Sequence, residues 1–223
     1  MGPHLITMLT YHDQTVPDAL TVFDQCRDLP VDYWGFKDVG LPPREMKKLV
    51  AAMKDAGKIT FLEVVRYSKE ECLASAKLAL ECGFDYLAGT IFHASVHEYL
   101  QGSPIKYFPF CGKVSGSPSV LDGTIPEIID EAKAIEDLGV GGFDLLAYRY
   151  VGDGEELARE FIRAVKVPVI MAGSIDSFGR LDRVRELRPW GFTIGSAFFD
   201  DRFVPGASFR EQIQKVSEYL ASF

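Results

Sequence analysis

Eight short runs of β-forming residues alternate with amphipathic stretches along this chain, and this alternation limits the fold more than any other feature. The runs that we predict as strands are rich in branched and aromatic residues and cover residues 5–11, 32–38, 59–67, 85–92, 105–110, 143–150, 168–175 and 191–198. Strands that alternate with helices form parallel sheets. Eight such units in 223 residues, without a strong G-x-G-x-x-G after the first run, favour a closed (β/α)₈ TIM barrel over an open doubly wound sheet.

The stretches between these runs carry the end signals of helices. Ser68 precedes Lys-Glu-Glu, Pro126 stands in a first turn, and Gly83 follows a helical pattern. A last helix is predicted from about Ser208. No linker interrupts the pattern, so we predict a single domain over residues 1–223.

The second half of the chain repeats features of the first half. TVPD (15–18), followed by a helix and DYWGFKD, corresponds to TIPE (124–127), followed by a helix and DLLAYRY. GFDYLAGTIF (83–92) likewise corresponds to GFTIGSAF (191–198). Chance similarity among βα units is the alternative, but the repeat favours a barrel built from two half-barrels.

The overall charge narrows the class of ligand. The formal net charge at pH 7 is −8, from 24 lysines and arginines against 32 aspartates and glutamates. Such a chain has no broad basic surface for nucleic acid or an anionic membrane. We therefore predict neither kind of partner, and an anionic ligand would need a local site. Monomer and homodimer both stay open.

Cysteine usage and apolar runs indicate a cytoplasmic protein. Cys26, Cys72, Cys82 and Cys111 form no C-x-x-C pair, and isolated buried cysteines suit a reducing compartment. The longest apolar runs have the length of a strand and not of a membrane helix. The first ten residues also lack the cationic and apolar regions of an export signal.

Two Gly-Ser pairs end the seventh and eighth predicted strands. In (β/α)₈ enzymes a phosphate commonly lies between these two loops, where backbone N–H groups approach the anion and glycine gives them room. Gly173-Ser174 and Gly195-Ser196 stand at these two places. Ordinary turn glycines are the alternative, but the pairing of both loops favours a site for a phosphorylated small-molecule substrate.

The segment PVIMAGSIDSFGRLDRVRELRPWGFTIGSAFF (168–199) resembles the last third of the ribulose-phosphate-binding barrel superfamily. That superfamily includes isomerases, epimerases, decarboxylases and aldolases, and the resemblance implies that both Gly-Ser pairs contact phosphate. The half-barrel repeat most resembles its histidine-biosynthesis isomerase branch. The chain lacks the aspartates of that branch in the runs 5–11 and 105–110, so we reject that specific activity. The repeat also makes Gly89-Thr90 a candidate second anion site.

Lys37 and Glu63 are the leading candidates for chemistry. In DYWGFKD, strand alternation turns Trp34 and Phe36 outward and Lys37 towards the barrel axis at the mouth. There a lysine serves as a Schiff-base nucleophile, an acid or base, or an anion ligand. Glu63 interrupts an apolar strand and needs a partner, which Lys37 on the adjacent strand supplies. The pair suits proton abstraction beside a carbonyl; a structural ion pair is the alternative.

Two further cations and a few histidines complete the candidates. Arg149, which the repeat aligns with Lys37, is expected to bind a second carboxylate or phosphate, or an acidic loop neighbour. Lys113 is the only cation in a Gly/Ser-rich segment, 111–123, that is typical of a mobile lid. His93 and His97 share a helical spacing but have no third ligand, so we predict no metal site.

His12-Asp13, after the first predicted strand, is kept in reserve. The stretch from FLEVVR (61–66) to LAGT also resembles 2-keto-3-deoxy-6-phosphogluconate-type aldolases, which use a glutamate and a Schiff-base lysine. Their lysine on the sixth strand is absent here, where FDLLAYRY stands. That leaves Lys37 or Lys113 for such a role.

The leading hypothesis is a cofactor-free enzyme of the isomerase, epimerase or aldolase-type lyase class. It would act on a phosphorylated sugar or keto acid by proton transfer or Schiff-base chemistry at the barrel mouth. The alternatives are a flavin oxidoreductase, which would hold the phosphate of FMN at the same loops, and a barrel that binds a phosphorylated metabolite without turning it over.

Overall fold

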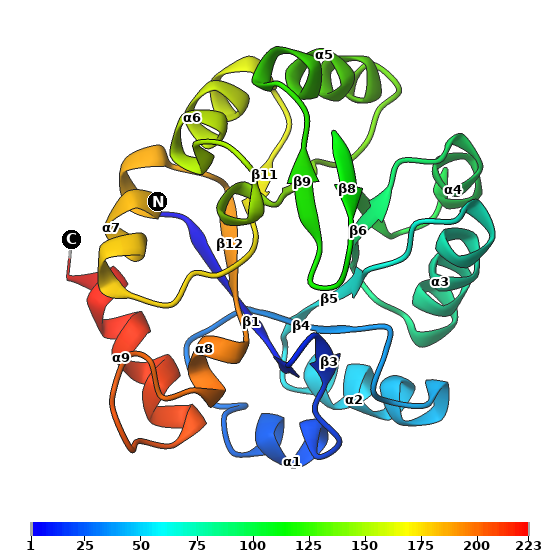
Figure 1. The fold of residues 1–223 in the computed structure, drawn as a ribbon. Coiled ribbons are helices and arrows are strands. Elements are labelled where there is room, and N and C mark those ends of the chain that lie inside the picture. Colours follow the sequence, from blue (N-terminus) through cyan, green and yellow to red (C-terminus); the bar gives the residue numbers. More distant parts are fainter. Residues whose placement is uncertain (1, 223) are drawn as a thin grey trace.

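Eight parallel strands curl around a central axis, with helices on the outside (Figure 1). The computed structural model describes residues 2–222. Its barrel strands are β1 (His4–Met8), β4 (Tyr33–Lys37), β5 (Ile59–Val64), β6 (Tyr86–Ile91), β7 (Lys106–Phe110), β10 (Phe143–Leu145), β11 (Val169–Met171) and β12 (Gly191–Ile194). They are hydrogen-bonded in the order β10-β11-β12-β1-β4-β5-β6-β7. At the remaining edge the Gly141 amide donates to the Tyr107 carbonyl at 2.9 Å, so the predicted (β/α)₈ barrel is confirmed and nearly closed.

Side-chain caps fix the starts of several helices. The helices are α1 (Ala19–Asp24), α2 (Pro43–Asp55), α3 (Lys69–Cys82), α4 (Ala94–Leu100), α5 (Ile125–Glu136), α6 (Gly154–Ala164), α7 (Phe178–Leu187), α8 (Ser196–Phe199) and α9 (Phe209–Ala221). Ser68 caps α3, and Thr124 and Ser208 form capping boxes at α5 and α9. The predicted last helix is therefore confirmed. Within residues 2–222, no helix has the length and apolar character needed to span a bilayer.

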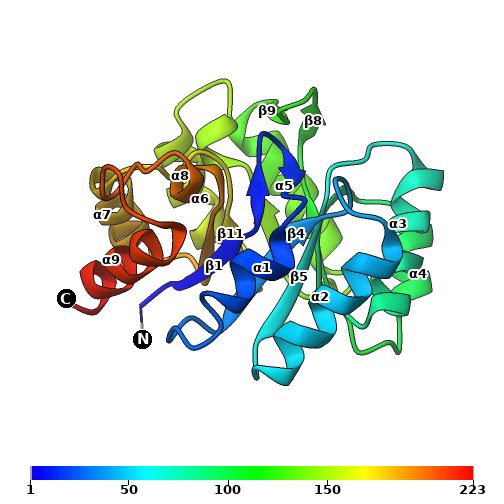
Figure 2. The same cartoon turned by 90° about the horizontal axis from the view of Figure 1, so that it is seen from below.

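Two small hairpins extend beyond the barrel strands, where the sequence pattern predicts one longer strand and a loop. The predicted strand 5–11 ends at Met8, and its last residues form a hairpin of β2 (Thr10–Tyr11) and β3 (Gln14–Thr15). The segment 111–123 holds the hairpin of β8 (Lys113–Ser115) and β9 (Val120–Asp122). Figure 2 shows β8 and β9 projecting from the end of the barrel opposite the chain's N-terminus.

The predicted strand 143–150 is also wrong beyond Leu145. Its second half is the 3₁₀ turn η1 (Ala147–Arg149), after which α6 begins. Gly154 packs so closely on this turn that a Cβ there would lie 2.1 Å from the Ala147 carbonyl oxygen. This contact bends the chain out of the sheet and places Arg149 on a turn at the mouth.

Aromatic rings fill the barrel interior at the end where the strands begin. Phe61 and Tyr86 stack with ring centroids 4.1 Å apart. Trp190 lies against Tyr33, with centroids 5.4 Å apart, and against Phe108 at 5.9 Å. Rings packed at these distances close the barrel at the end where the strands begin. The open end is therefore the end at which the strands finish.

Alternation along β4 is confirmed. Trp34 and Phe36 are fully buried in the outer core between strands and helices, whereas Tyr33 packs inside the barrel. Gly35 also faces inward, because a Cβ there would lie 2.6 Å from the Met8 sulfur. Met8 therefore fills the space beneath Lys37, the last residue of the strand.

Gly142, beside the nearly closed edge, tests how tightly the barrel is packed. A Cβ at Gly142 would lie 2.4 Å from the Phe108 ring and 2.4 Å from the Pro168 carbonyl oxygen, whereas a Cβ at Gly179 in α7 meets open space. We expect Gly142→Ala to lower the free energy of unfolding by about 1–3 kcal/mol and Gly179→Ala to raise it by about 0.5 kcal/mol. Urea denaturation measures both, and equal effects of the two substitutions would contradict the packing at this edge.

Candidate functional site

A cavity of about 540 Å³ opens at the end of the barrel where the strands finish. Its lining comes from the ends of β1, β4 and β5 and from the loops that follow β10, β11 and β12. Among the candidate residues, those in this lining are Lys37, Glu63, Arg149, Gly173, Ser174, Gly195 and Ser196 and, from the reserve pair His12-Asp13, Asp13. The lining does not contain Gly89, Thr90 or Lys113. The fold therefore brings the acid and base candidates and both Gly-Ser pairs to one cavity.

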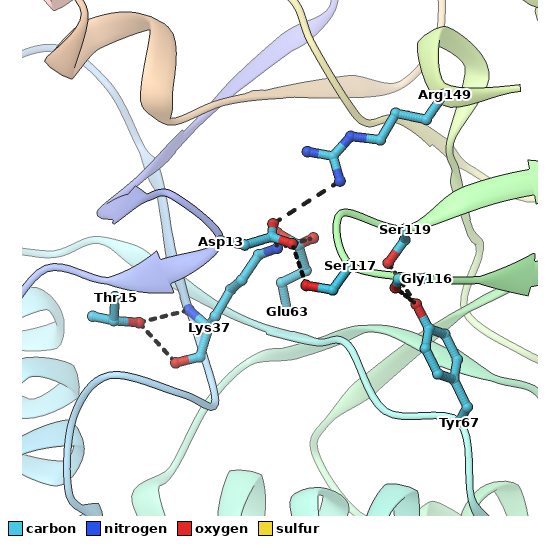
Figure 3. Close-up of polar contacts among 9 residues, drawn as sticks. All are labelled: Asp13, Thr15, Lys37, Glu63, Tyr67, Gly116, Ser117, Ser119 and Arg149. Atoms are coloured by element: carbon cyan, nitrogen blue, oxygen red, sulfur yellow. Dashed lines mark hydrogen bonds and ion pairs between the residues drawn. The ribbon is translucent and has the colours of Figure 1, made fainter.

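Lys37 lies in this cavity between two carboxylates. β4 and β5 pair in parallel with Lys37 directly opposite Glu63, and the Lys37 Nζ is 3.5 Å from the Glu63 Oε1. The same Nζ lies 2.5 Å from the Oδ1 of Asp13, on the turn between β2 and β3 (Figure 3). The lysine is only 3% exposed. Strand register supplies one acid and the first hairpin supplies the other.

The backbone of Lys37 is fixed by Thr15. The Thr15 hydroxyl donates to the Lys37 carbonyl at 2.8 Å and accepts from the Lys37 amide at 2.9 Å. Gly40 lets the two segments approach, because a Cβ at its left-handed φ of 98° would lie 2.3 Å from the Thr15 carbonyl oxygen. Hairpin and strand end are thus one unit, which holds Asp13 beside the ammonium group.

The charges of this cluster keep Lys37 protonated. Burial lowers the pKa of Lys37, but Glu63 and Asp13 raise it, and the pKa ends above its ordinary value. Burial raises the pKa of Asp13, but the hydrogen bond and charge of Lys37 outweigh this and leave it below its ordinary value. Lys37 is therefore a cation and Asp13 an anion at neutral pH.

Arg149 approaches Asp13 from the turn η1 after β10, whereas Lys37 and Glu63 lie on β4 and β5. Its Nη1 lies 3.9 Å from the Asp13 Oδ1, and 25% of its side chain is exposed. Gly173 makes room for it, because a Cβ there would lie 2.9 Å from the Arg149 Cγ. Arg149 thus passes over the loop after β11 and points towards Asp13 (Figure 3).

The two Gly-Ser loops present backbone donors to the cavity. Gly173 and Ser174 both have left-handed φ angles, of 88° and 50°, and within residues 2–222 their amides donate no hydrogen bond to the protein. Ser196 is the first residue of α8, where an amide has no partner within the helix. Gly195 lies against Thr10, whose hydroxyl oxygen would be 2.6 Å from a Cβ at this position. Amides in such loops bind phosphate oxygens.

Sequence reasoning missed Asp144. This residue is on β10, level with Ile170 in the barrel interior, and is 2% exposed. Its Oδ1 has no hydrogen-bond partner. Burial, followed by the charge of Glu63, raises the pKa of Asp144 well above its ordinary value, against the opposing effect of Lys37. A single acid in the apolar run FDLLAYRY is the same signal that identified Glu63, so the sequence does contain it.

Other missed polar residues lie beside the loop after β11. Asp176 and Arg202 line the cavity. The Asp176 carboxylate lies 3.4 Å from the Arg180 Nη1 and 3.8 Å from the Arg202 Nη2. Arg180 also donates to the Ser174 carbonyl. Arg202 thus brings a cation and Asp176 an acid to the cavity wall, and Arg180, in the first turn of α7, contacts this acid.

The remaining candidates lie outside this cavity. Gly89 and Thr90 have φ angles of 75° and 66°, and the Thr90 hydroxyl contacts the Tyr107 hydroxyl at 2.6 Å. Gly89 also backs onto β5, where a Cβ would lie 2.3 Å from the Val64 carbonyl oxygen. Lys113 is exposed on β8, opposite Asp122.

The tip of the β8–β9 hairpin lies over the cluster. The Tyr67 hydroxyl donates to the Gly116 carbonyl at 2.6 Å and contacts the Ser119 hydroxyl at 2.8 Å, and the Ser117 hydroxyl is 3.5 Å from the Asp13 Oδ2 (Figure 3). The tip therefore covers one side of the mouth. In the described part of the chain, no three histidine, cysteine or acidic residues are grouped to hold a metal ion.

The barrel is similar to several solved structures. One is orotidine 5′-monophosphate decarboxylase from Methanocaldococcus jannaschii in complex with the inhibitor BMP, with a TM-score of 0.76 and 15% identity over 99% of both chains. Another is native KDPGal, with a TM-score of 0.68 and 14% identity over 97% of this chain and 96% of that chain. The tryptophan synthase alpha chain from Legionella pneumophila has a TM-score of 0.67 and 12% identity over 100% and 93%. At these identities the similarity shows the shared barrel fold.

No protein-family model and no curated protein sequence matches the chain.

Asp144 gives the stability of the protein a characteristic pH dependence. Its pKa is raised in the folded state, so the folded protein binds a proton that the unfolded chain releases above the ordinary value of 3.8. We expect the free energy of unfolding of the wild type to fall, relative to that of Asp144→Asn, by about 1.4 kcal/mol per pH unit above that value, until the pKa of the folded state is passed. Chemical denaturation at a series of pH values measures this.

The exposed Asp130 on α5 provides the control for this experiment. Asp130→Asn should follow the wild type across the series, because its side chain lies in solvent. Parallel curves for the wild type and Asp144→Asn would show that Asp144 is ionised in the folded protein.

Proposed function

We propose that this protein is an enzyme that isomerises or cleaves a phosphorylated sugar or keto acid by proton transfer. The observation that carries the proposal is the single cavity of about 540 Å³, which has the two Gly-Ser loops in one part of its wall and the Lys37 cluster in another. A small phosphorylated molecule bound by its phosphate at the loops would place its carbon skeleton over the cluster.

The backbone geometry of the Gly-Ser loops supports the binding of a phosphate group there. The Gly173 and Ser174 amides are unpaired within the described chain. Arg149 and Arg202 bring cations to the lining of the cavity, which also contains the carboxylates of Asp176 and Asp200. The overall charge of −8 would otherwise repel an anion. A local group of donors and cations is therefore what such a ligand requires, and barrels of similar fold include a decarboxylase of a 5′-monophosphate.

The cluster favours proton transfer over Schiff-base chemistry. A lysine attacks a carbonyl only as the neutral amine. Lys37 instead has two carboxylate neighbours, at 2.5 and 3.5 Å, and its pKa is raised. An ammonium group held in this way donates hydrogen bonds to a substrate oxygen, whereas Glu63, 15% exposed and on the cavity wall, is placed to accept a proton.

These roles give a balanced reaction. Glu63 takes a proton from the carbon next to a carbonyl, and the electron pair of the broken C–H bond forms the enolate, whose oxygen the Lys37 ammonium stabilises. Return of the proton to the opposite face of the same carbon gives an epimer. When that carbon carries a hydroxyl group, return of the proton to the former carbonyl carbon, with transfer of the hydroxyl proton to the enolate oxygen, gives the isomer in which the carbonyl group has moved by one carbon. In the cleavage reaction Glu63 takes the proton of a hydroxyl group, the C–C bond breaks, and the same enolate forms as the leaving fragment.

Phosphate binding can be tested at Ser196. We expect inorganic phosphate or members of a panel of phosphorylated sugars and keto acids to raise the melting temperature of the wild type. Ser196→Asp should remove this shift, because a carboxylate at this exposed position repels the anion. The same aspartate is favourable at the first position of α8, so the loss would not come from a weakened fold.

Ser196→Ala is the matched control, since it keeps the backbone amide and adds no charge, and should retain the shift. FMN belongs in the panel, because a flavin oxidoreductase is the competing interpretation. A shift with FMN alone would favour that class, and no shift with any phosphorylated compound would refute the proposal.

Glu63→Gln tests the proton transfer. The amide keeps the shape of the side chain but accepts no proton, so we expect turnover to fall about 10²–10⁴-fold. The dissociation constant of the phosphorylated ligand should change by less than about threefold. Solvent deuterium incorporation into the ligand, followed by NMR, measures the chemical step, and an unchanged exchange rate in Glu63→Gln would remove the glutamate from this role.

A further inference from the structure

Asp13 stands between two cationic side chains at the mouth of the barrel. Its Oδ1 lies 2.5 Å from the Lys37 Nζ and 3.9 Å from the Arg149 Nη1. Asp13 lines the cavity and keeps 21% of its side chain exposed, so a ligand in the cavity has access to the same two cations. An ammonium and a guanidinium that face one carboxylate form a site with the charge and donors that a carboxylate requires.

The N–H donors of Arg149 are largely unused by the protein. A guanidinium has five donors in a fixed fork, but the contact with Asp13 at 3.9 Å is longer than a hydrogen bond. No other acidic group lies within 4.0 Å of it in residues 2–222. The side chain crosses Gly173, in one of the two Gly-Ser loops, and points towards Asp13 (Figure 3). A ligand bound at the loops would therefore meet a free guanidinium fork.

Asp13 differs from the other acid of the cluster because it lies on a hairpin turn and not on a barrel strand, although its contact with Lys37, at 2.5 Å, is the shorter one. Lys37 and Glu63 are opposite each other on paired barrel strands. Asp13 belongs to a two-residue turn in which both His12 and Asp13 have left-handed φ angles, of 47° and 64°. Histidine and aspartate adopt this conformation more readily than most residues other than glycine, so the turn does not require the contact between Asp13 and Lys37. Of the two carboxylates beside Lys37, Asp13 is the one that can leave.

We propose that Asp13 is an internal counter-ion that a carboxylate of the substrate displaces from Lys37 and Arg149. The substrate class is then a phosphorylated carboxylic acid, with its phosphate at the two Gly-Ser loops and its carboxylate between the two cations. This inference rests on the proposed function and selects the acid from the two ligand classes named there.

Because the charges of the cluster already balance, a carboxylate of the ligand would replace Asp13 and not bind beside it. Lys37 and Arg149 carry two positive charges, and Asp13 and Glu63 carry two negative ones. A further carboxylate beside Asp13 would leave an excess of negative charge in a partly buried site. Exchange of Asp13 for the ligand keeps the balance, and the same exchange frees the Asp13 turn.

Two ligands with the same carbon skeleton test the inference. 3-Phosphoglycerate and glycerol 3-phosphate share the phosphate and differ only in a carboxylate against a hydroxymethyl group. We expect the wild type to bind 3-phosphoglycerate at least about tenfold more tightly, measured by calorimetry at neutral pH and constant ionic strength. Inorganic phosphate serves as a third ligand that reports on the loops alone.

Two variants assign the preference to its residues. Arg149→Met keeps an unbranched side chain over Gly173 and removes the fork, so the two ligands should bind within about threefold of each other. Asp13→Asn removes the internal competitor and should increase the preference for 3-phosphoglycerate about tenfold, with little change for glycerol 3-phosphate. Circular dichroism and the melting temperature verify that both variants are folded.

The outcomes separate this inference from the proposed function. Equal affinities of the wild type for the two ligands, or an unchanged preference in either variant, would overturn the inference while phosphate binding stands. If the wild type binds neither ligand nor inorganic phosphate, the proposed phosphate site fails and the inference fails with it.

Discussion

The ion pairs of the nearly buried Lys37 ammonium group determine much of the architecture at the mouth of this barrel. An unpaired charge at 3% exposure would be too costly to persist. Glu63 reaches it through the parallel register of β4 and β5, and Asp13 reaches it because the β2–β3 hairpin, fixed by Thr15, folds back over the strand end. The hairpin, the strand end and the cation therefore stabilise one another. Removal of the hairpin would leave Lys37 with Glu63 as its remaining acidic neighbour among the described residues.

The barrel could be predicted from the sequence because the signals for each strand and each helix lie within that element. Strand-forming runs and amphipathic stretches alternate eight times, several of the stretches carry a side-chain cap, and each unit predicts a strand and a helix without knowledge of the others. The ends of the strands depended on distant contacts. After Leu145 the chain enters the 3₁₀ turn against which Gly154 packs, and after Met8 the following residues form a hairpin. Neither run, 5–11 or 143–150, contains a glycine or a proline that would mark those breaks.

The residues of the candidate site also fall into those that the sequence could predict and those that it could not. The pairing of Lys37 with Glu63 follows from their positions on neighbouring strands, and the Gly-Ser loops follow from their places after β11 and β12. Asp13 could not be assigned, because its role depends on the fold of a hairpin and on an arginine far away in the sequence. Asp144 differs from both cases. Its signal, an acid within an apolar strand, is the one that identified Glu63, and its burial without a partner for one oxygen is visible only in three dimensions.

The aromatic layer inside the barrel has a consequence for the path of protons. Phe61, Tyr86 and Trp190 close the interior from below, and the tip of the β8–β9 hairpin leans across the mouth above Asp13. Water thus reaches Lys37 and Glu63 from one side only. A ligand that fills the cavity stands in that single route. Under the role proposed for Glu63, a hydrogen ion that it takes from the ligand therefore exchanges with bulk solvent more slowly than one held on an open surface.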